Sequence, residues 1–512
     1  MYDVCLMLEG TYPFVSGGVS TWVHHLVKAL PELLFTGICI LPTSKEKWER
    51  KYDLPDNFRD LRVVYLHDYE LTPQARVKQK KRSQQIELLR TFHQGIKGKK
   101  YSLFADILPF FQSSKKEAYL PYDMIYGKDA WDLLLEFYGP EKNRESFIDY
   151  FWTFRFTHLP IFKVLSTDIP MAKVYHTVST GYAGILGAEA KDLYGKPLLL
   201  TEHGIYTKER KIEIAQSEWV YVADADQIKL KKELGAFQKI WIQLFDSLGR
   251  ITYQEADRIY TLYEGNRELE LAGGANPDKV FVIPNGVDIN RFSSLKPVDS
   301  GDEWDEKGVF NVGFVGRVVP IKDVKTLLRA VKIVSLRLPN VKFHVMGPTD
   351  ENPEYYKECL ELMDVLRLQS HLEFTGKVNV MDYYPILHLL VLTSISEAQP
   401  LVILEANCAG IPVVASDVGA CRELLEGRTE QDRALGPSGI VTQVADPVST
   451  AEGIISILSN RELRKEMALS GRKRVKKFYR ESDLNREYLS VYRELMGGET
   501  SGHEAIDGRH RL

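Results

Sequence analysis

Residues 392–416 read Leu392-Thr-Ser-Ile-Ser-Glu-Ala-Gln-Pro-Leu-Val-Ile-Leu-Glu-Ala-Asn-Cys-Ala-Gly-Ile-Pro-Val-Val-Ala-Ser416. The stretch opens at the end of an apolar run of strand length, His388–Thr393, and then passes through a polar loop. Pro400 suits the first turn of a helix, where its missing N–H is no loss, and Gly410 signals the end of that helix. Val413–Ser416 predicts the next strand. Together these features predict one βαβ unit of a parallel α/β sheet.

Two glutamates, Glu397 and Glu405, lie in this unit. Because ligands bind beyond the carboxyl ends of parallel strands, Glu397 is expected at the ligand crevice and Glu405 in the helix behind it. The backbone at the start of that helix would face an anion. The predicted anion-binding turn comprises Ala398, Gln399, Pro400, Leu401 and Val402. Two carboxylates can bind the hydroxyl groups of a sugar, and backbone amides beside them can bind phosphate, so this arrangement indicates a site for a sugar nucleotide. The alternative is a buried helix that contains two acidic residues with no role in binding.

A second motif, residues 311–327, predicts a strand, a glycine-containing turn and a helix. Arg317 and Lys322 flank the turn. A guanidinium and an ammonium in this arrangement favour a pyrophosphate clamp. The alternative is a solvated charge pair at the start of a helix.

With the intervening strand Val341–Gly347, the two motifs resemble the retaining glycosyltransferases of family 4. The combination of Glu-x7-Glu with an upstream arginine and lysine carries this resemblance. It implies the GT-B fold, in which two Rossmann-like domains face a cleft, and it implies transfer of a sugar from a nucleotide donor.

Further segments narrow the resemblance. Residues 4–24, 201–210, 283–288 and 396–401 are similar to the PelF-type glycosyltransferases, a cytosolic family of Pel exopolysaccharide synthesis. The resemblance covers nearly the whole chain except a polar tail, residues 501–512. It implies a UDP-sugar donor, a growing polysaccharide acceptor and a cytoplasmic location. Association with an inner-membrane polysaccharide synthase complex, at the inner face of the cytoplasmic membrane, is a further expectation from the same resemblance.

Length and composition bound the architecture. A chain of 512 residues exceeds what one hydrophobic core supports, which predicts two domains. No run of eighteen apolar residues and no basic N-terminal region occurs, so neither a membrane span nor a secretory signal is expected. The net charge of −4 argues against a nucleic-acid-binding protein. The five cysteines show no CxxC pair and predict buried thiols in a reducing compartment; they are Cys5, Cys39, Cys359, Cys408 and Cys421.

The order of predicted elements divides the chain into three parts. Residues 1–285 are expected to form an acceptor-side Rossmann-like domain, with a helical insertion at about 72–159. Residues 286–484 are expected to form the Rossmann-like domain that binds the nucleotide sugar. Residues 485–512 are expected to hold a helix that returns to the first domain, followed by the polar tail.

Candidate residues of the first domain follow its predicted strands. Gly17 and Gly18 would allow the backbone to approach the donor phosphate. The alternative is that they form an ordinary turn between a strand and a helix. The resemblance places His203 beside the donor sugar, where its backbone carbonyl would stabilise positive charge at the anomeric carbon. A role for His176 towards acceptor or donor is open, and Lys208 and Arg210 either bind an anionic group or form a solvated face.

A basic run occupies the predicted insertion, residues 76–82, and is followed by Lys97, Lys99 and Lys100. A solvated helix face is the ordinary interpretation of such a run. Docking to a membrane or an acidic partner is the functional alternative.

These residues predict a mechanism. Arg317 and Lys322 would stabilise the leaving diphosphate, Glu397 would bind a hydroxyl of the transferred sugar, and Glu405 would accept hydrogen bonds from the ribose. No metal or other cofactor is expected, because the site motifs lack an Asp-x-Asp pair. Val378, in a loop after a predicted strand, is the candidate for uracil recognition. A GT-B sugar-nucleotide epimerase and a non-catalytic nucleotide-sugar-binding subunit of a membrane synthase complex remain as alternatives.

Overall fold

The computed structural model of the protein describes residues 1–68, 86–87, 89–91, 93, 104, 108, 127–139, 146–216, 235–292, 294–295 and 308–497. The chain divides into two compact units. The first comprises Met1–Thr261, Arg267–Val282 and Tyr488–Leu512, and the second comprises Leu262–Asn266 and Ile283–Glu487. The basic residues at 76–82, 97, 99 and 100, part of the predicted insertion and the tail at 501–512 lie outside the described residues.

The first unit is built on a seven-stranded sheet in the order β3-β2-β1-β4-β5-β6-β7, and every neighbouring pair is parallel. The strand order reverses beside β1, which is the topology of a doubly wound Rossmann-like fold. The strands are β1 (Tyr2–Glu9), β2 (Phe35–Leu41), β3 (Phe58–Tyr65), β4 (Ala172–Thr177), β5 (Leu198–Glu202), β6 (Arg258–Thr261) and β7 (Val280–Val282). The helices are α1 (Gly18–Ala29), α5 (Lys128–Tyr138), α6 (Phe147–Leu165), α7 (Tyr182–Tyr194), α8 (Tyr206–Gln216), α9 (Ala236–Glu255), α10 (Glu264–Gly273) and α19 (Glu481–Leu495).

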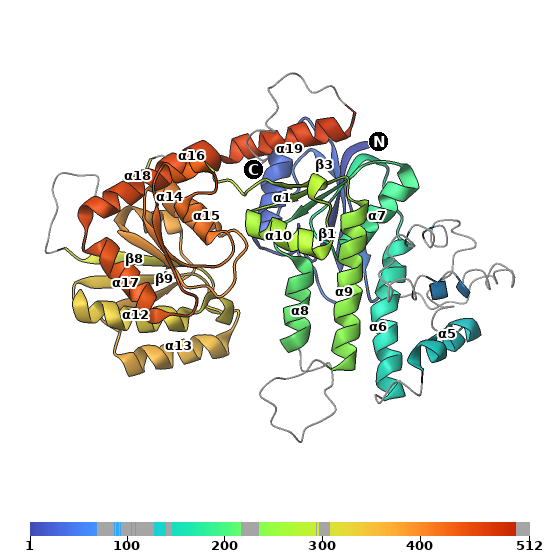
Figure 1. Ribbon diagram of the computed structural model, residues 1–512, viewed down its shortest axis with the longest axis horizontal. Helices are drawn as coiled ribbons and strands as arrows, with labels where there is room; N and C mark the ends of the chain where they lie inside the picture. Colours follow the sequence, from blue (N-terminus) through green and yellow to red (C-terminus); the bar gives the residue numbers. More distant parts are fainter. Residues whose placement is uncertain are drawn as a thin grey trace. The chain divides into compact units, whose positions relative to one another are not determined.

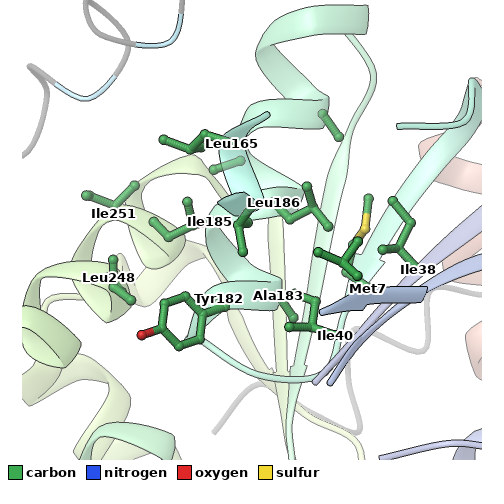
Figure 2. Packing of buried hydrophobic residues seen from close by; sticks show 14 of the residues in the cluster. Met7, Ile38, Ile40, Leu165, Tyr182, Ala183, Ile185, Leu186, Leu248 and Ile251 are labelled. Atoms are coloured by element: carbon green, nitrogen blue, oxygen red, sulfur yellow. The ribbon is translucent and has the colours of Figure 1, made fainter. Parts of the chain in front are cut away.

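The core of this unit lies between its sheet and the helices that follow the strands. Met7 of β1 and Ile38 of β2 are fully buried against Leu186 of α7. Figure 2 shows side chains from β1, β2, α6, α7 and α9 gathered in this one cluster. Strands in the middle of a parallel sheet are covered by helices on both faces, and residues 4–8 of β1 are accordingly buried without a break.

The second unit contains a six-stranded parallel sheet in the order β10-β9-β8-β11-β12-β13. The strands are β8 (Phe310–Val315), β9 (Val341–Met346), β10 (Leu372–Gly376), β11 (Leu389–Leu392), β12 (Val413–Ser416) and β13 (Gly439–Thr442). The helices are α11 (Ile289–Phe292), α12 (Val324–Arg337), α13 (Pro353–Leu366), α14 (Leu401–Ala409), α15 (Cys421–Glu426), α16 (Glu430–Arg433), α17 (Pro447–Leu458) and α18 (Arg461–Phe478).

Alternate residues of the second sheet belong to two separate cores. In β11, Leu389 and Val391 pack with α12, α13 and α17, whereas Leu390 and Leu392 pack with α14 and α15. Figure 1 shows α12 and α13 on one side of these strands and α14 and α15 on the other. The period of two follows from the pleat of a strand, which sends successive side chains to opposite faces.

Within the second unit, the backbone at Val287 is hydrogen-bonded to the segment between α18 and α19. Val287 donates its N–H to the carbonyl of Tyr479 at 2.9 Å, and Glu481 donates to the carbonyl of Val287 at 3.2 Å. A Cβ on Gly286 would lie 2.5 Å from the Cα of Glu481, so only glycine allows this approach. Beyond Glu481, α19 continues into the first unit, where the Tyr492 hydroxyl bonds to His176 Nδ1 at 2.6 Å.

The five cysteines are free and buried, which confirms the prediction of unpaired thiols inside the fold. Burial raises the pKa of each of them above its ordinary value. Among the residues that the structure describes, no helix is both long enough and apolar enough to span a membrane.

Two buried carboxyls lie in the first unit. Glu202 ends β5 and Glu270 lies on α10, and both side chains are fully buried. Glu202 accepts hydrogen bonds from the Tyr253 hydroxyl at 2.6 Å and from the Tyr206 N–H at 3.0 Å. Burial raises the pKa of Glu270 well above its ordinary value of 4.5, and the negative charge of Glu202 raises it further. Burial raises the pKa of Glu202 as well.

We therefore expect the first unit to lose stability as the pH rises. The folded protein retains a proton on Glu270 that the unfolded chain releases above pH 4.5, so the stabilisation is complete below that pH and declines as the pH rises towards the folded pKa. Glu270→Gln stays neutral and should raise the free energy of unfolding at pH 8 by about 1–3 kcal/mol. Urea unfolding at pH 5 and pH 8 measures this, with Glu268→Gln on the exposed face of the same helix as the control. An unchanged pH dependence in Glu270→Gln would contradict the assignment.

Candidate functional site

The predicted βαβ unit is present at residues 389–416. β11 is followed by α14 and then by β12, which pairs with β11 in parallel from Leu390 and Val413 onward. Pro400 immediately precedes the first helical residue, and Gly410 ends the helix with a left-handed backbone, φ 79°. The loop between β11 and α14 therefore lies at the carboxyl edge of the sheet, as the sequence predicts.

Lys322 and Glu397 form a direct ion pair at this edge. The Lys322 Nζ contacts Glu397 Oε1, and the Ser394 hydroxyl donates to the same oxygen at 2.6 Å. The two charged side chains are only 16% and 13% exposed, so water screens their attraction weakly. The sequence places both residues in one site but does not predict their contact, which joins positions 75 apart.

Backbone contacts fix the turn that carries Lys322. The Thr393 hydroxyl is 3.1 Å from the carbonyl oxygens of both Lys322 and Asp323, and the Ile395 N–H donates to the carbonyl of Ile321 at 2.9 Å. Asp323 has a left-handed backbone, φ 44°, and caps α12 by accepting the Thr326 N–H. Lys322 is therefore held against the loop that presents Glu397.

Arg317 follows β8 and has a more open environment. Its side chain is 54% exposed, and its Nη1 lies 2.7 Å from Glu351 Oε2. The ends of β8 and β9 approach each other closely beside Arg317. A Cβ on Gly347 would lie 2.0 Å from the carbonyl oxygen of Gly316, which leaves no room for a side chain there. Arg317 therefore has a solvent-exposed partner, whereas Lys322 has a buried one.

Glu405 is the fifth residue of α14 and has two neighbours. The Tyr384 hydroxyl donates to Oε2 at 3.1 Å, and Arg291 Nη1 lies 4.0 Å from Oε1. Burial raises the pKa of Glu405, while the hydrogen bond from Tyr384 and the charge of Arg291 act in the opposite direction. The sequence shows no local signal for either neighbour.

The predicted anion-binding turn, Ala398–Val402, is anchored from two directions. The Ala420 N–H donates to the carbonyl of Ala398 at 2.7 Å, and Gln399 Oε1 accepts the Asn285 N–H at 2.6 Å. A Cβ on Gly419, whose φ is 54°, would lie 2.2 Å from the carbonyl oxygen of Glu397. Glycine at position 419 is thus required for the loop to close.

Val378, the candidate for uracil recognition, lies just beyond β10 and is partly buried in the same core as α14. Gly376 before it has a left-handed backbone, φ 67°, and its carbonyl accepts the Gly347 N–H at 2.9 Å. This hydrogen bond joins the ends of β9 and β10 just before the loop that contains Val378.

In the first unit, Gly17 caps α1 and Gly18 is its first residue. A Cβ on either glycine meets no heavy atom within 4 Å. Packing inside the unit therefore does not require glycine at these two positions, and their proposed approach to a phosphate stays a prediction.

His203 follows β5 and is 7% exposed. Its ring lies edge to face against Trp22 of α1, with ring centroids 4.6 Å apart. Burial lowers the pKa of His203 to about 4, so the imidazole is neutral at pH 7. Trp22 was not among the predicted site residues, and nothing near it in the sequence indicates this contact.

His176 is fully buried, and both its ring nitrogens are bonded within the unit. Nδ1 bonds to the Tyr492 hydroxyl at 2.6 Å and Nε2 to the Thr201 hydroxyl at 2.9 Å. Burial lowers the pKa of His176 to about 3. These bonds join β4 and β5 to α19, a structural arrangement that the sequence could not reveal.

The two cations on α8 have different surroundings. Lys208 is exposed. Arg210 lies 5.2 Å from the centre of the Tyr206 ring and pairs with Glu213 at 2.9 Å. A role of either residue towards an anionic ligand stays a prediction.

Among the described residues, no group of three or more histidine, cysteine, aspartate or glutamate side chains could hold a metal ion. The chain does contain one Asp-x-Asp sequence, Asp224-Ala-Asp226, which lies outside the described residues. The expectation of a metal-independent site therefore stays a prediction.

Two examples of solved structures share this fold. Sucrose-phosphate synthase from Thermosynechococcus elongatus has a TM-score of 0.57 and 15% identity, over 96% of this chain and 99% of that one. Anabaena HepE, solved in complex with UDP, has a TM-score of 0.58 and 14% identity over the same shares. These likenesses confirm the predicted α/β GT-B class with two Rossmann-like domains.

Curated relatives include proteins named D-inositol 3-phosphate glycosyltransferase. The protein from Geodermatophilus obscurus is 27% identical over 303 residues, which cover 56% of this chain and 60% of that protein. The one from Paenarthrobacter aurescens is 24% identical over 306 residues, covering 57% and 66% respectively. The chain thus spans less than two thirds of the length of these relatives.

Two family models match consecutive parts of the chain. Residues 2–278, more than half of the sequence, match the domain of unknown function DUF3492. Residues 303–474, which contain Arg317, Lys322, Glu397 and Glu405, match the glycosyl transferases group 1 model. The chain therefore belongs to the DUF3492 family, and its residues 303–474 match the glycosyl transferases group 1 model.

Proposed function

We propose that the protein is a retaining, metal-independent glycosyltransferase that moves a sugar from a UDP-sugar to a growing Pel-type exopolysaccharide. The observation that carries this proposal is the ion pair of Lys322 and Glu397 at the loop between β11 and α14, with Glu405 one helical turn further on. The ion pair lies at the carboxyl edge of a parallel sheet, where ligands bind in such folds, and this supports a role for Lys322 towards the diphosphate and for Glu397 towards the sugar. Glu405, on the helix that follows, is proposed as the carboxylate for the ribose.

The chemistry of sugar transfer suits this grouping. Negative charge grows on the diphosphate as its bond to the anomeric carbon breaks, and a fixed cation stabilises that charge more in the transition state than in the ground state. Lys322 supplies this cation, and Arg317 supplies a second one from the turn after β8. In retention by front-face attack, the leaving phosphate accepts the proton of the acceptor hydroxyl, so the protein needs no separate base.

UDP is proposed as the nucleotide because HepE, which shares the fold, was solved in complex with UDP and in complex with UDP-glucose. The Pel-type acceptor rests on the sequence resemblance of the first unit and of residues 396–401. That resemblance also supports a cytoplasmic location and docking to an inner-membrane synthase complex.

The direct test is a screen of nucleotide sugars that measures nucleotide release with and without an oligosaccharide acceptor. We expect release from a UDP-sugar that depends on acceptor and persists in EDTA, and a product whose anomeric configuration by NMR matches that of the donor. Conversion of the donor alone would indicate an epimerase. Binding of UDP without turnover of any donor would indicate the non-catalytic subunit, and loss of activity in EDTA with recovery in magnesium would contradict metal independence.

Glu405→Ala is expected to weaken UDP binding by about 1.5–3 kcal/mol, because a charged hydrogen-bond acceptor for the ribose is lost. The ribose contact acts equally on ground state and transition state, so kcat should change little. Isothermal titration and steady-state kinetics on this variant measure both quantities. Glu397→Ala should show the opposite pattern, with UDP affinity nearly intact and turnover reduced. A reversed outcome for the two variants would reverse the assigned roles.

A further inference from the structure

The second glutamate of the site is held in place by a buried tyrosine. Tyr384 opens a short 3-10 helix, Tyr384–Ile386, and only 2% of its surface is exposed. Its hydroxyl donates to Glu405 Oε2 at 3.1 Å. The two residues are 21 positions apart and lie on different elements of the second unit. The carboxylate of Glu405 is therefore anchored from outside its own helix.

The hydroxyl of Tyr384 matters for this contact and not for packing. Its ring lies 6.0 Å from that of Phe292, within a cluster of buried apolar side chains that includes Leu387 and Leu404. Phenylalanine would fill the same space. A hydroxyl in such surroundings is unfavourable unless it is hydrogen-bonded, and an ionised carboxylate can only accept. Tyr384 is thus a donor matched to Glu405.

This anchoring leaves the other carboxylate oxygen in a defined place. Oε1 lies 4.0 Å from Arg291 Nη1, which exceeds the length of a hydrogen bond. The side chain of Glu405 is 23% exposed, so a ligand can reach it. The two neighbouring hydroxyl groups of a ribose are hydrogen-bond donors. A carboxylate oxygen such as Oε1, held in a fixed orientation, can accept hydrogen bonds from them.

We propose that Tyr384 is a positioning residue for nucleotide binding, which holds Glu405 Oε2 so that Oε1 is presented to the ribose diol of the donor. The proposal rests on the proposed function, in which Glu405 binds the ribose. Arg291 acts beside it by keeping a positive charge near the carboxylate without occupying Oε1.

Tyr384→Phe removes the hydroxyl and keeps the ring. Isothermal titration with UDP and with 2′,3′-dideoxy-UDP separates positioning from structure. We expect the unmodified protein to bind UDP about 10- to 100-fold more tightly than the dideoxy nucleotide, as a charged hydrogen-bond acceptor predicts. In Tyr384→Phe, UDP should bind about 3- to 10-fold more weakly, while the dideoxy nucleotide should stay within about twofold. Tyr383→Phe, which changes the neighbouring half-buried tyrosine beside His344, is the matched control and should leave both affinities unchanged.

Tyr384→Phe in the Glu405→Ala background provides a second measurement. If the Tyr384 hydroxyl acts by positioning the Glu405 carboxylate, its removal from a protein that already lacks the carboxylate should change the affinity for UDP by less than about twofold. If the hydroxyl acts in another way, Tyr384→Phe should weaken UDP binding in the Glu405→Ala background as much as it does in the unmodified protein.

Several outcomes would overturn the proposal. Equal weakening of both nucleotides in Tyr384→Phe would make the hydroxyl merely structural. An undiminished preference for UDP in that variant, or an equal effect of Tyr384→Phe with and without the Glu405 carboxylate, would remove its positioning role. These failures leave the proposed function intact. A protein that binds neither nucleotide, or that binds both equally before any substitution, would instead contradict the proposed nucleotide site itself.

Discussion

Lys322→Ala is expected to lower kcat by about 100- to 1,000-fold, the loss typical of removing one preorganised group that faces developing charge. Nζ of Lys322 is already fixed on Glu397 within a weakly screened pair, so it needs no reorganisation when charge appears on the diphosphate. The affinity for UDP should fall by less than kcat, because the charge on the leaving group is largest in the transition state. Steady-state kinetics with the donor found by the screen, together with titration of UDP, measure the two effects.

Lys325→Ala is the matched control for this prediction. Lys325 lies three residues further along the chain, on α12, and pairs with Glu358, with 31% and 56% of the two side chains exposed. Its removal should leave kcat within about twofold, since a surface ion pair contributes little. Similar losses in both variants would indicate a general effect of charge, and an active Lys322→Ala would remove Lys322 from the catalytic machinery.

Local sequence patterns predicted those parts of the fold in which consecutive residues decide the structure. The run from His388 to Ser416 gives β11, α14 and β12 because apolar runs, Pro400 and Gly410 mark where each element begins and ends. Parallel strands then place the loop with Glu397 at the carboxyl edge of the sheet. The residues of this loop could therefore be assigned to a site without coordinates.

The contacts that complete the site are long-range and could not be predicted in this way. Tyr384 and Arg291 reach Glu405 from other elements, and Trp22 reaches His203 from α1. His176 is bonded to Tyr492, 316 positions away. Nothing in the residues around either partner distinguishes such pairs from ordinary buried side chains, because their meeting depends on sheet order and on where α19 ends.

The same limit applies to the buried ion pair that supports the second unit. Arg474 on α18 and Asp432 on α16 are 0% and 2% exposed, and Nε lies 2.6 Å from Oδ1. The guanidinium also donates to the carbonyls of Leu425 and Gly436, each at 2.8 Å. A charged residue on a helix rich in lysine and arginine is normally expected in solvent, so the sequence alone gives no sign of this role.

Arg474→Met should lower the free energy of unfolding of the second unit by about 3–5 kcal/mol. Methionine keeps much of the volume of the side chain but leaves the Asp432 carboxylate and two backbone carbonyls buried without their donor, and it is this loss of compensation that destabilises the fold. Urea unfolding followed by circular dichroism, with hydrogen exchange of β12 and β13 to locate the change, measures the effect.

The exposed pair of Arg422 and Asp417 isolates burial as the cause. Its nitrogen and oxygen are also 2.6 Å apart, but its side chains are 53% and 45% exposed. Arg422→Met should therefore cost no more than about 1 kcal/mol, because water solvates the remaining carboxylate and screens the original attraction. If the two arginine variants lost stability equally, the distance between the charged atoms, and not their burial, would determine how much each ion pair contributes to stability. If Arg474→Met unfolded like the unmodified protein, the buried network would not support the unit that carries Lys322, Glu397 and Glu405.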